Sequence, residues 1–372
     1  FFLADVSADF RRALIETQYP ADPQDLPVPS QSSTTYDLYR SEGDGRFTWM
    51  SRGLAANDGG HDVRFGGASR DLERIVFQTR RPLTPEVADD SVMHVYGREG
   101  DRTVLISVAP DGTPVAANAE VGNAGEISSG SASYPLGRFN FAVSADGSTV
   151  FFESGGQLYV RLRAFDADAR TVHVSRSRRT GGGADCANAM FLAASRDGSK
   201  AFFYCATQLT DDGAANGVYA YDVATDELRF LTPSSGGSGD VVFLGSDPDA
   251  THVSFQSRRL YTPDAKPAPL YNVYVLRHEQ IQHVGVAQTS TEVTNPTKVS
   301  VSQDGTGFAF ATSADNGDPR ANGLVQVYGY DAATDTLTCV SCRPDGSPSQ
   351  AAAGLTDAGL LEFNPPQRVR PP

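Results

Sequence analysis

Residues 139–154, FNFAVSADGSTVFFES, decide the fold. Phe139, Phe141 and Val143 alternate with other residues, which is the two-residue period of a strand with one buried face. The Asp-Gly pair that follows indicates a tight turn, because glycine accepts a positive φ and aspartate hydrogen-bonds the turn backbone. A second apolar run begins at residue 150. The stretch therefore predicts a β-hairpin, which needs further strands or a packing partner to be stable.

The same pattern recurs along the chain in six copies of differing quality. Each copy has an aspartate followed six positions later by a large apolar residue: Asp9 and Ile15, Asp71 and Phe77, Asp146 and Phe152, Asp197 and Phe203, Asp249 and Phe255, and Asp304 and Phe310. A serine precedes the aspartate by two positions in five copies. An aliphatic residue followed by tyrosine then begins a third strand, and a fourth short strand follows. Each copy therefore predicts about four strands over roughly 50 residues, the length of a propeller blade.

Six such units in order predict radial repetition, because no unit can bury both of its faces alone. The predicted fold is all-β: a six-bladed β-propeller of four-stranded antiparallel blades, with seven blades as the alternative. One domain is expected over residues 1–342, with blades at about 1–53, 62–109, 138–176, 188–232, 240–286 and 297–342. Residues 343–372 are predicted to form a tail that packs on the propeller or closes it. The tail ends in PPQRVRPP, which cannot form a central strand.

The unit S-x-D-G-x-x-x-x-F, followed by a loop, an aliphatic-Tyr pair and a strand ending near Leu-Thr, resembles the WD-like propeller repeat of TolB-type proteins. The resemblance covers nearly the whole chain, and the third, fourth and sixth units are the closest copies. It implies that the loops between second and third strands open on one face, together with the blade-to-blade crossings. Relatives of this repeat include periplasmic assembly partners, gating domains of prolyl-oligopeptidase-type peptidases and secreted bacterial proteins. The resemblance therefore indicates a fold and not an activity.

The net charge of the chain argues against one class of partner, nucleic acids. Its net charge of −14 comes from 31 basic and 45 acidic residues. Nucleic-acid binding depends on clustered Lys and Arg, so we expect no nucleic-acid partner. No run approaches the roughly 18 apolar residues of a membrane span, so we expect none.

Four cysteines predict two disulfides. Cys186 precedes the first strand of the fourth unit and Cys205 ends its second strand, so the hairpin brings them together. Cys339 and Cys342 form a C-x-x-C, for which a redox pair, half a zinc site and a structural disulfide are the alternatives. The disulfide is favoured, because Cys339 ends a strand instead of beginning a helix and no second C-x-x-C completes a zinc site. Paired cysteines predict an oxidising, extracytoplasmic compartment, either periplasmic or secreted.

The loops between second and third strands hold the candidate binding residues. The predicted calcium ligands are Asp211, Asp212, Asn216, Asp315, Asn316 and Asp318. The predicted binding residues of the loop face are Asp22, Asp37, Asp264 and Asn272. Ca²⁺ takes six to eight oxygen ligands of these kinds. Asp, Asn and Gly are also ordinary turn residues, and no loop keeps the full D-x-N-G-x-x-D pattern of related repeats, so turn chemistry is the alternative.

Three functions are compatible with these patterns. The favoured one is a non-catalytic extracytoplasmic propeller that binds a protein or glycan through its loop-rich face, because neither G-x-S-x-G nor H-E-x-x-H occurs in the chain. The second is a hydrolase or lyase that uses channel-facing carboxylates, which an acid pair or a raised carboxyl pKa would support. The third is a propeller module of a longer polypeptide or assembly.

Overall fold

The computed structural model describes residues 2–17, 19, 21–22, 36–52, 63–88, 91–122, 140–234, 236, 241–288, 299–302, 306–355 and 361–362. The chain forms two compact units, Phe1–Phe230 and Leu231–Pro372, here called the N-terminal and C-terminal units. The described residues form six four-stranded antiparallel sheets and one two-stranded sheet. The predicted all-β propeller class of four-stranded blades is therefore confirmed. A single domain over 1–342 with a tail over 343–372 stays a prediction.

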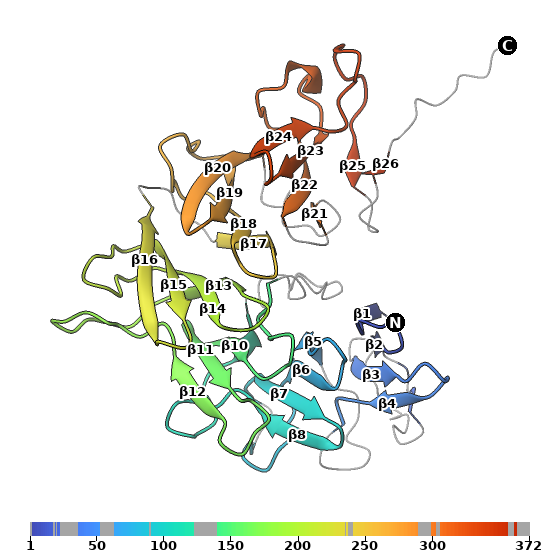
Figure 1. The fold of residues 1–372 in the computed structure, drawn as a ribbon, viewed down its shortest axis with the longest axis vertical. Coiled ribbons are helices and arrows are strands. Elements are labelled where there is room, and N and C mark those ends of the chain that lie inside the picture. Colours follow the sequence, from blue (N-terminus) through green and yellow to red (C-terminus); the bar gives the residue numbers. More distant parts are fainter. Residues whose placement is uncertain are drawn as a thin grey trace. The chain divides into compact units, whose positions relative to one another are not determined.

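Each four-stranded sheet is a blade, numbered in chain order (Figure 1). Blades 1 and 2 comprise β1 (Phe2–Val6), β2 (Ala13–Thr17), β3 (Asp37–Ser41) and β4 (Phe47–Trp49), then β5 (Arg64–Ala68), β6 (Arg74–Thr79), β7 (His94–Glu99) and β8 (Arg102–Leu105). Blades 3 and 4 comprise β9 (Ala119–Val121), β10 (Val150–Ser154), β11 (Gln157–Leu162) and β12 (Arg170–His173), then β13 (Ala189–Ala194), β14 (Lys200–Cys205), β15 (Gly217–Asp222) and β16 (Glu227–Pro233).

The C-terminal unit holds the remaining strands. Blades 5 and 6 comprise β17 (Val241–Ser246), β18 (His252–Ser257), β19 (Tyr271–Arg277) and β20 (Gln280–Ala287), then β21 (Val299–Val301), β22 (Gly307–Thr312), β23 (Gln326–Asp331) and β24 (Thr336–Cys339). The two-stranded sheet pairs β25 (Gly354–Leu355) with β26 (Leu361–Glu362), and one short 3-10 helix, η3 (Pro319–Ala321), precedes β23.

The Ser-x-Asp turn between the first two strands has one geometry. In blade 3 the Ser144 hydroxyl donates to Asp146 Oδ1 (2.6 Å) and accepts from the backbone N–H of Thr149 (2.9 Å). Gly147 follows with a φ of 74°, a conformation that glycine adopts without strain. The same serine-to-aspartate bond closes three other turns: Ser7 to Asp9, Ser69 to Asp71 and Ser195 to Asp197. The sequence motif is therefore a hydrogen-bonded structural unit.

Two series of hydrogen bonds join the blades of the N-terminal unit. In the first, backbone N–H groups of successive turns donate to the next turn: Ala8 to Arg70 (2.9 Å), Arg70 to Ala145 (2.9 Å) and Ala145 to Arg196 (2.7 Å). In the second, a side chain on the second strand accepts from the first strand of the next blade: Glu16 from Phe65, Gln78 from Val121, and Glu153 from Phe191. Blades 1 to 4 therefore lie side by side in chain order.

Aromatic pairs across the second and third strands form the core of each blade. The phenylalanine of each predicted pair in blades 2 to 6 is fully buried. Each stacks or tilts against the tyrosine opposite it: Phe77 and Tyr96, Phe152 and Tyr159, Phe203 and Tyr219, Phe255 and Tyr274, and Phe310 and Tyr328. Burying one such ring stabilises the fold by about 1.5–3 kcal/mol. The apolar residues that define the sequence repeat are therefore also the residues that form the core.

The structure corrects the predicted start of blade 3, given above as about residue 138. Its first strand is β9, whose Val121 pairs with Phe152, while Val143 makes only an isolated bridge to Val150. Phe139 lies outside the described residues. In blade 4 the first strand has a bulge at this point, between Phe191 and Ala193. Blade 3 carries residues 123–141 at the same place. A bulge residue has no ladder partner, so an insertion there leaves the pairing of both halves intact.

Candidate functional site

The loops between second and third strands differ widely from blade to blade. They span residues 18–36, 80–93, 155–156, 206–216, 258–270 and 313–325. Blade 3 turns on two glycines, and a Cβ at Gly156 would lie 2.8 Å from the carbonyl oxygen of Ala187. Blade 3 therefore needs a turn of two glycines at this place. The corresponding loops of the other blades are longer and can carry side chains that bind a partner.

Two of the predicted binding residues meet at Trp49. Asp37 is buried, and its Oδ1 accepts from Trp49 Nε1 (3.1 Å) and from the Ser51 hydroxyl (2.9 Å). Asp22 Oδ2 accepts from the Trp49 backbone N–H (3.1 Å). These carboxylates bind Trp49 of β4, one from residue 22 and the other from the first residue of β3.

The blade 4 loop carries Asp211, Asp212 and Asn216. The Asp211 carboxylate accepts from the backbone N–H (3.2 Å) and the hydroxyl (2.5 Å) of Thr180, and these bonds lower its pKa. Asn216 has a φ of 59° and accepts from the Tyr204 hydroxyl (2.8 Å). Asp212 is exposed. Two of the three predicted ligands therefore already fasten the loop, in agreement with turn chemistry.

The blade 6 loop carries Asp315, Asn316 and Asp318. Asp315 Oδ1 accepts from the Gly317 backbone N–H (2.8 Å). The Asn316 amide binds both the N–H and the carbonyl of Val286 in β20 (2.7 and 3.0 Å), so it clamps blade 6 to blade 5. Asp318 caps η3 and forms an ion pair with Arg320 (2.6 Å). Calcium binding by these two loops stays a prediction.

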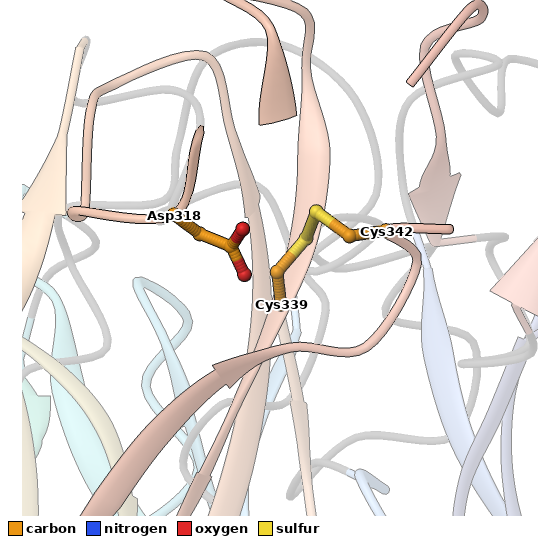
Figure 2. A group of neighbouring side chains, drawn as sticks. All are labelled: Asp318, Cys339 and Cys342. Atoms are coloured by element: carbon orange, nitrogen blue, oxygen red, sulfur yellow. A yellow bond between two sulfur atoms is a disulfide. The ribbon is translucent and has the colours of Figure 1, made fainter. Parts of the chain in front are cut away.

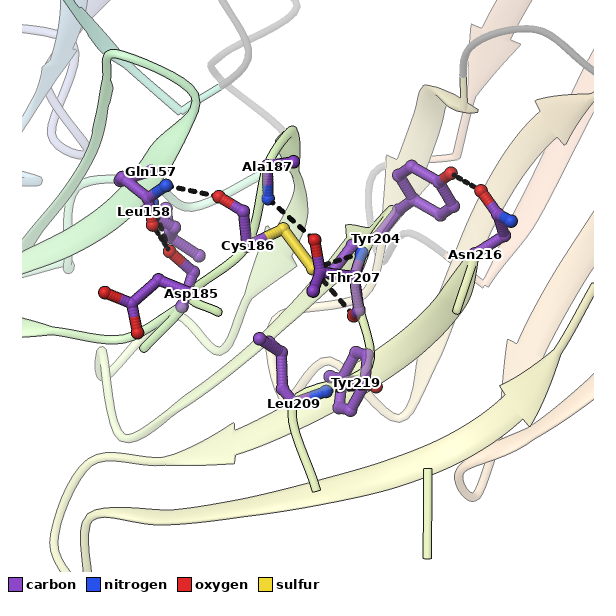
Figure 3. The surroundings of a disulfide bond; sticks show 12 residues. Gln157, Leu158, Asp185, Cys186, Ala187, Tyr204, Thr207, Leu209, Asn216 and Tyr219 are labelled. Atoms are coloured by element: carbon purple, nitrogen blue, oxygen red, sulfur yellow. Dashed lines mark hydrogen bonds between the residues drawn. A yellow bond between two sulfur atoms is a disulfide. The ribbon is translucent and has the colours of Figure 1, made fainter. Parts of the chain in front are cut away.

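The predicted disulfide Cys186–Cys205 is confirmed. It joins the segment before β13 to the end of β14, with Cα atoms 5.7 Å apart (Figure 3). Both cysteines are fully buried, and Gln157 of blade 3 donates to the Cys186 carbonyl. The bond therefore ties the entry of blade 4 to its own second strand.

The Cys339–Cys342 disulfide is also confirmed, with Cα atoms 5.4 Å apart. Figure 2 shows the Asp318 carboxylate beside it, with the three potential ligand atoms within 4.8 Å of one another. A metal is bound by a thiolate and not by a disulfide sulfur. The oxidised pair is therefore a structural link at the end of β24.

Asp264 lies in the blade 5 loop, and Asn272 lies at the start of β19. Asn272 is fully buried and binds both the N–H (2.7 Å) and the carbonyl (2.9 Å) of Lys266, which folds the loop back on itself. Asp264 Oδ2 lies 3.3 Å from His283 Nδ1. The structure thus brings Asp22 and Asp37 to the same residue, Trp49, and it leaves the other predicted residues in three groups, in blades 4, 5 and 6.

A groove of about 370 Å³ in the C-terminal unit was not predicted. Residues of blades 5 and 6 line it: Thr262, Asp264, Ile281, Gln282, His283, Val284, Tyr330, Asp335 and Leu337. Sequence reasoning missed it because its wall comes from two blades. One signal was present: Y-D-x-A-T-D-x-L occurs at residues 221–228 and again at 330–337.

A pair of glutamates in blade 3 was also missed, because β9 was not predicted. Glu120 of β9 is the cross-strand partner of Glu153 in β10. Burial raises the pKa of Glu120, and the nearby Arg64 opposes that shift. Directly opposed side chains in antiparallel strands have Cβ atoms about 5 Å apart. The pair therefore places the side chain of Glu120, whose pKa is raised, on the same face of the sheet as the side chain of Glu153.

No protein-family profile and no curated protein matches this chain. Similar solved structures include TolB from Acinetobacter baumannii, at 12% identity over 82% of this chain and 60% of that chain, with a TM-score of 0.36. Dipeptidyl peptidase 4 from Porphyromonas gingivalis matches at 11% identity over 96% of this chain and 48% of that chain, with a TM-score of 0.48.

The β-propeller domain of Cps50 (Swd1) from Myceliophteria thermophila matches at 9% identity over 92% of this chain and 93% of that chain, with a TM-score of 0.42. This chain spans 60% and 62% of the lengths of two TolB structures, from Acinetobacter baumannii and Agrobacterium tumefaciens. Among the described residues, no helix is long and apolar enough to cross a membrane. The sheets of the described residues make this an all-β protein of four-stranded propeller blades.

Proposed function

We propose that this chain is an extracytoplasmic propeller without catalytic activity, which binds a protein or a glycan through the loops between its second and third strands. One observation carries the proposal. The Ser-x-Asp turns share one geometry, whereas these loops range from two glycines in blade 3 to residues 18–36 in blade 1. Irregular loops on a uniform scaffold are where binding residues concentrate.

Hydrogen bonds that fasten two of these loops support the same function. Asn272 of β19 binds Lys266 of the blade 5 loop, and the half-buried Asn316 holds the blade 6 loop to Val286. A fastened loop loses less conformational entropy when it binds, so it gains affinity by preorganisation. The two disulfides support an oxidising compartment.

The experiment is a binding screen against a glycan array and against extracytoplasmic proteins, followed by matched variants. Asp212→Ala and Asp315→Ala change exposed residues of the long loops. Asp44→Ala and Asp166→Ala change exposed residues in turns between third and fourth strands. We expect the first pair to weaken binding by about tenfold and the second pair to leave it unchanged. Equal losses in both pairs would contradict the proposed face.

A hydrolase or lyase is the second candidate, and the Glu120–Glu153 pair favours it. Glycoside hydrolysis uses two carboxyl groups, and burial raises the pKa of the one that acts as the acid, as burial does for Glu120 here. Hydrolysis of a panel of glycosides and uronides that falls by at least about a hundredfold in Glu120→Gln would establish this candidate. Activity equal in wild type and variant would exclude Glu120 from catalysis.

The third candidate, a module of a longer polypeptide or assembly, stays a prediction. The intact mass of the native protein tests it, since a mass larger than that of these residues would identify further chain.

A further inference from the structure

The two copies of Y-D-x-A-T-D-x-L build the same hydrogen bond in different blades. In blade 4 the Tyr221 hydroxyl donates to Asp226 Oδ1 (2.9 Å), and in blade 6 the Tyr330 hydroxyl donates to Asp335 Oδ1 (2.8 Å). Both aspartates have a left-handed backbone, with φ of 56° and 52°. Burial, followed by the bond to Asp335, raises the pKa of Tyr330, so its hydroxyl stays the donor. The two Tyr-Asp pairs are therefore structural equivalents.

The pair in blade 4 shows what such a carboxylate binds. Asp226 forms ion pairs with Arg176 (2.9 Å) and Arg178 (2.7 Å), both from the segment that follows β12 of blade 3. Each guanidinium brings N–H donors to an oxygen of the same carboxylate, and such charge-assisted bonds are the strong ones. Within the N-terminal unit, a basic R-x-R segment therefore occupies the Tyr-Asp pair.

The part of the chain that the structure describes places no such basic segment at the pair in blade 6. Among the described residues, the hydrogen bond from Tyr330 is the only polar contact of the Asp335 side chain, and no Lys or Arg forms an ion pair with it. Arg277 lies near enough to influence the pKa of Tyr330 but forms no ion pair with Asp335. The groove of about 370 Å³ opens at Asp335.

Three further residues of the groove, Thr262, Gln282 and His283, have side-chain atoms without hydrogen-bond partners among the described residues, and two of these atoms are acceptors. Gln282 Oε1 and His283 Nε2 are buried and unpaired among the described residues. The His283 side chain is 10% exposed, and its Nδ1 faces Asp264 Oδ2 at 3.3 Å. A carboxylate only accepts, so the ring proton is on Nδ1 and Nε2 is left as an acceptor. Burial lowers the pKa of His283, which keeps the ring neutral near pH 7.

The composition of the groove thus specifies the chemistry of a ligand. Two carboxylates, an amide oxygen and a ring nitrogen offer acceptors, and the Thr262 hydroxyl can accept as well as donate. Ile281, Val284 and Leu337 are the apolar residues of the lining. A group that consists of donors on an aliphatic stem fits both features. An arginine side chain has five N–H donors and three methylenes. The net charge of −14 also attracts basic segments over distance.

We propose that this groove binds an arginine side chain from a basic segment of a partner protein, with Asp335 accepting the guanidinium as Asp226 accepts Arg176 and Arg178. The groove is lined by β20 of blade 5 and by β23, β24 and the turn between them in blade 6. Thr262 and Asp264 of the blade 5 loop complete the lining. The proposal does not depend on the binding face described above, and it holds or fails separately.

The test uses a fluorescent peptide of sequence SRSRRT, which copies residues 175–180 of this protein. Binding to the full chain is measured by fluorescence anisotropy at low ionic strength, because screening weakens exposed charge pairs. The matched control peptide has citrulline in place of every arginine. We expect the arginine peptide to bind and the citrulline peptide to bind at least about tenfold more weakly.

The protein variants separate the groove from general attraction to an acidic surface. Asp335→Asn is expected to weaken binding of the arginine peptide by about tenfold. Asp331→Asn removes one exposed charge four residues away and is expected to change binding by less than about twofold. Asparagine tolerates the left-handed backbone of residue 335, so we expect the Asp335→Asn variant to keep the fold. An unfolding midpoint equal to that of the wild type checks this.

Gln282→Leu is the second variant, because it removes the unpaired acceptor without changing charge. Gln282→Leu, like Asp335→Asn, is expected to weaken binding of the arginine peptide. Equal binding of the arginine and citrulline peptides, or wild-type affinity in both variants, would overturn the proposal. The loop-face variants Asp212→Ala and Asp315→Ala leave the groove intact and test the other face separately.

Discussion

The serine of the Ser-x-Asp turn in each of blades 1 to 4 is buried, and its hydroxyl both donates and accepts. Ser195 donates to Asp197 Oδ1 (2.6 Å) and accepts from the Lys200 N–H (3.0 Å). Blade 5 departs from the pattern: Asp247 takes the place of the serine and accepts from the His252 N–H (3.0 Å). The position therefore requires an acceptor for the backbone N–H that closes the turn.

Ser195→Ala should destabilise the N-terminal unit by about 1–3 kcal/mol, because it removes the buried hydroxyl that donates to Asp197 and accepts from the Lys200 N–H. Urea unfolding measures the change. Ser199→Ala is the matched control, since the exposed Ser199 hydroxyl binds the same Asp197 oxygen, and it should cost less than about 0.5 kcal/mol. Equal effects of both substitutions would mean that the turn network does not depend on Ser195.

The turn aspartates also set an acid dependence. The Ser195 hydroxyl, more than any other group, lowers the pKa of Asp197 in the folded state. A group with a lowered folded pKa stabilises the fold fully above its unfolded pKa, and this stability is lost as pH falls through the folded value. Stability should therefore fall as pH decreases below about 4, and Asp197→Asn should reduce that slope. A slope unchanged in the variant would contradict the assignment.

Residue-scale chemistry is also what the sequence predicted best. The Ser-x-Asp-Gly turns and the buried phenylalanines lie within a few residues of one another, so local pattern located both. The roles of Asp37 and Asn316 were not predictable, because the partners Trp49 and Val286 come from other strands or another blade. The candidate ligands were recognised as polar loop residues, but their use as fastenings depends on packing.

At the scale of strands and loops, the prediction failed where the chain is interrupted. The first strand of blade 3 is split by residues 123–141, so the apolar run before the turn supplies only the half at Ala142 and Val143. The sequence around Ala119–Val121 contains no pattern to show that these residues begin a strand which continues only after an insertion. The groove beside Asp335 was missed for a related reason, because β20 and β24 belong to different blades.

The two disulfides close loops of very different length, with separations of 19 and 3 residues. The chain-entropy account gives about 3 kcal/mol for the first and about 2 kcal/mol for the second. The double variant Cys186→Ser/Cys205→Ser should therefore lower the unfolding midpoint more than Cys339→Ser/Cys342→Ser. Urea unfolding of both variants checks the order, and the reverse order would show that native-state contacts outweigh loop entropy.

At the scale of the whole molecule, the blades are one hairpin unit repeated, and the loops carry the differences.

The acidic charge and the polar loops also leave calcium as a prediction for residues 211–216 and 315–318. A ligand that binds only the folded state raises its stability. Calcium should therefore raise the thermal midpoint over that in chelator, and Asp212→Asn with Asp315→Asn should abolish the increase. An equal midpoint in calcium and in chelator would favour turn chemistry.

Amide hydrogen exchange followed by mass spectrometry tests most directly whether identical turns form a rigid scaffold beneath unequal loops. The account predicts slow exchange at the amides that close the turns, among them Arg12, Arg74, Thr149 and Lys200, whose N–H groups donate to a turn serine. It predicts faster exchange by at least about a hundredfold at exposed amides of residues 206–216 and 313–325. Turn amides that exchange as fast as the loop amides would contradict the account.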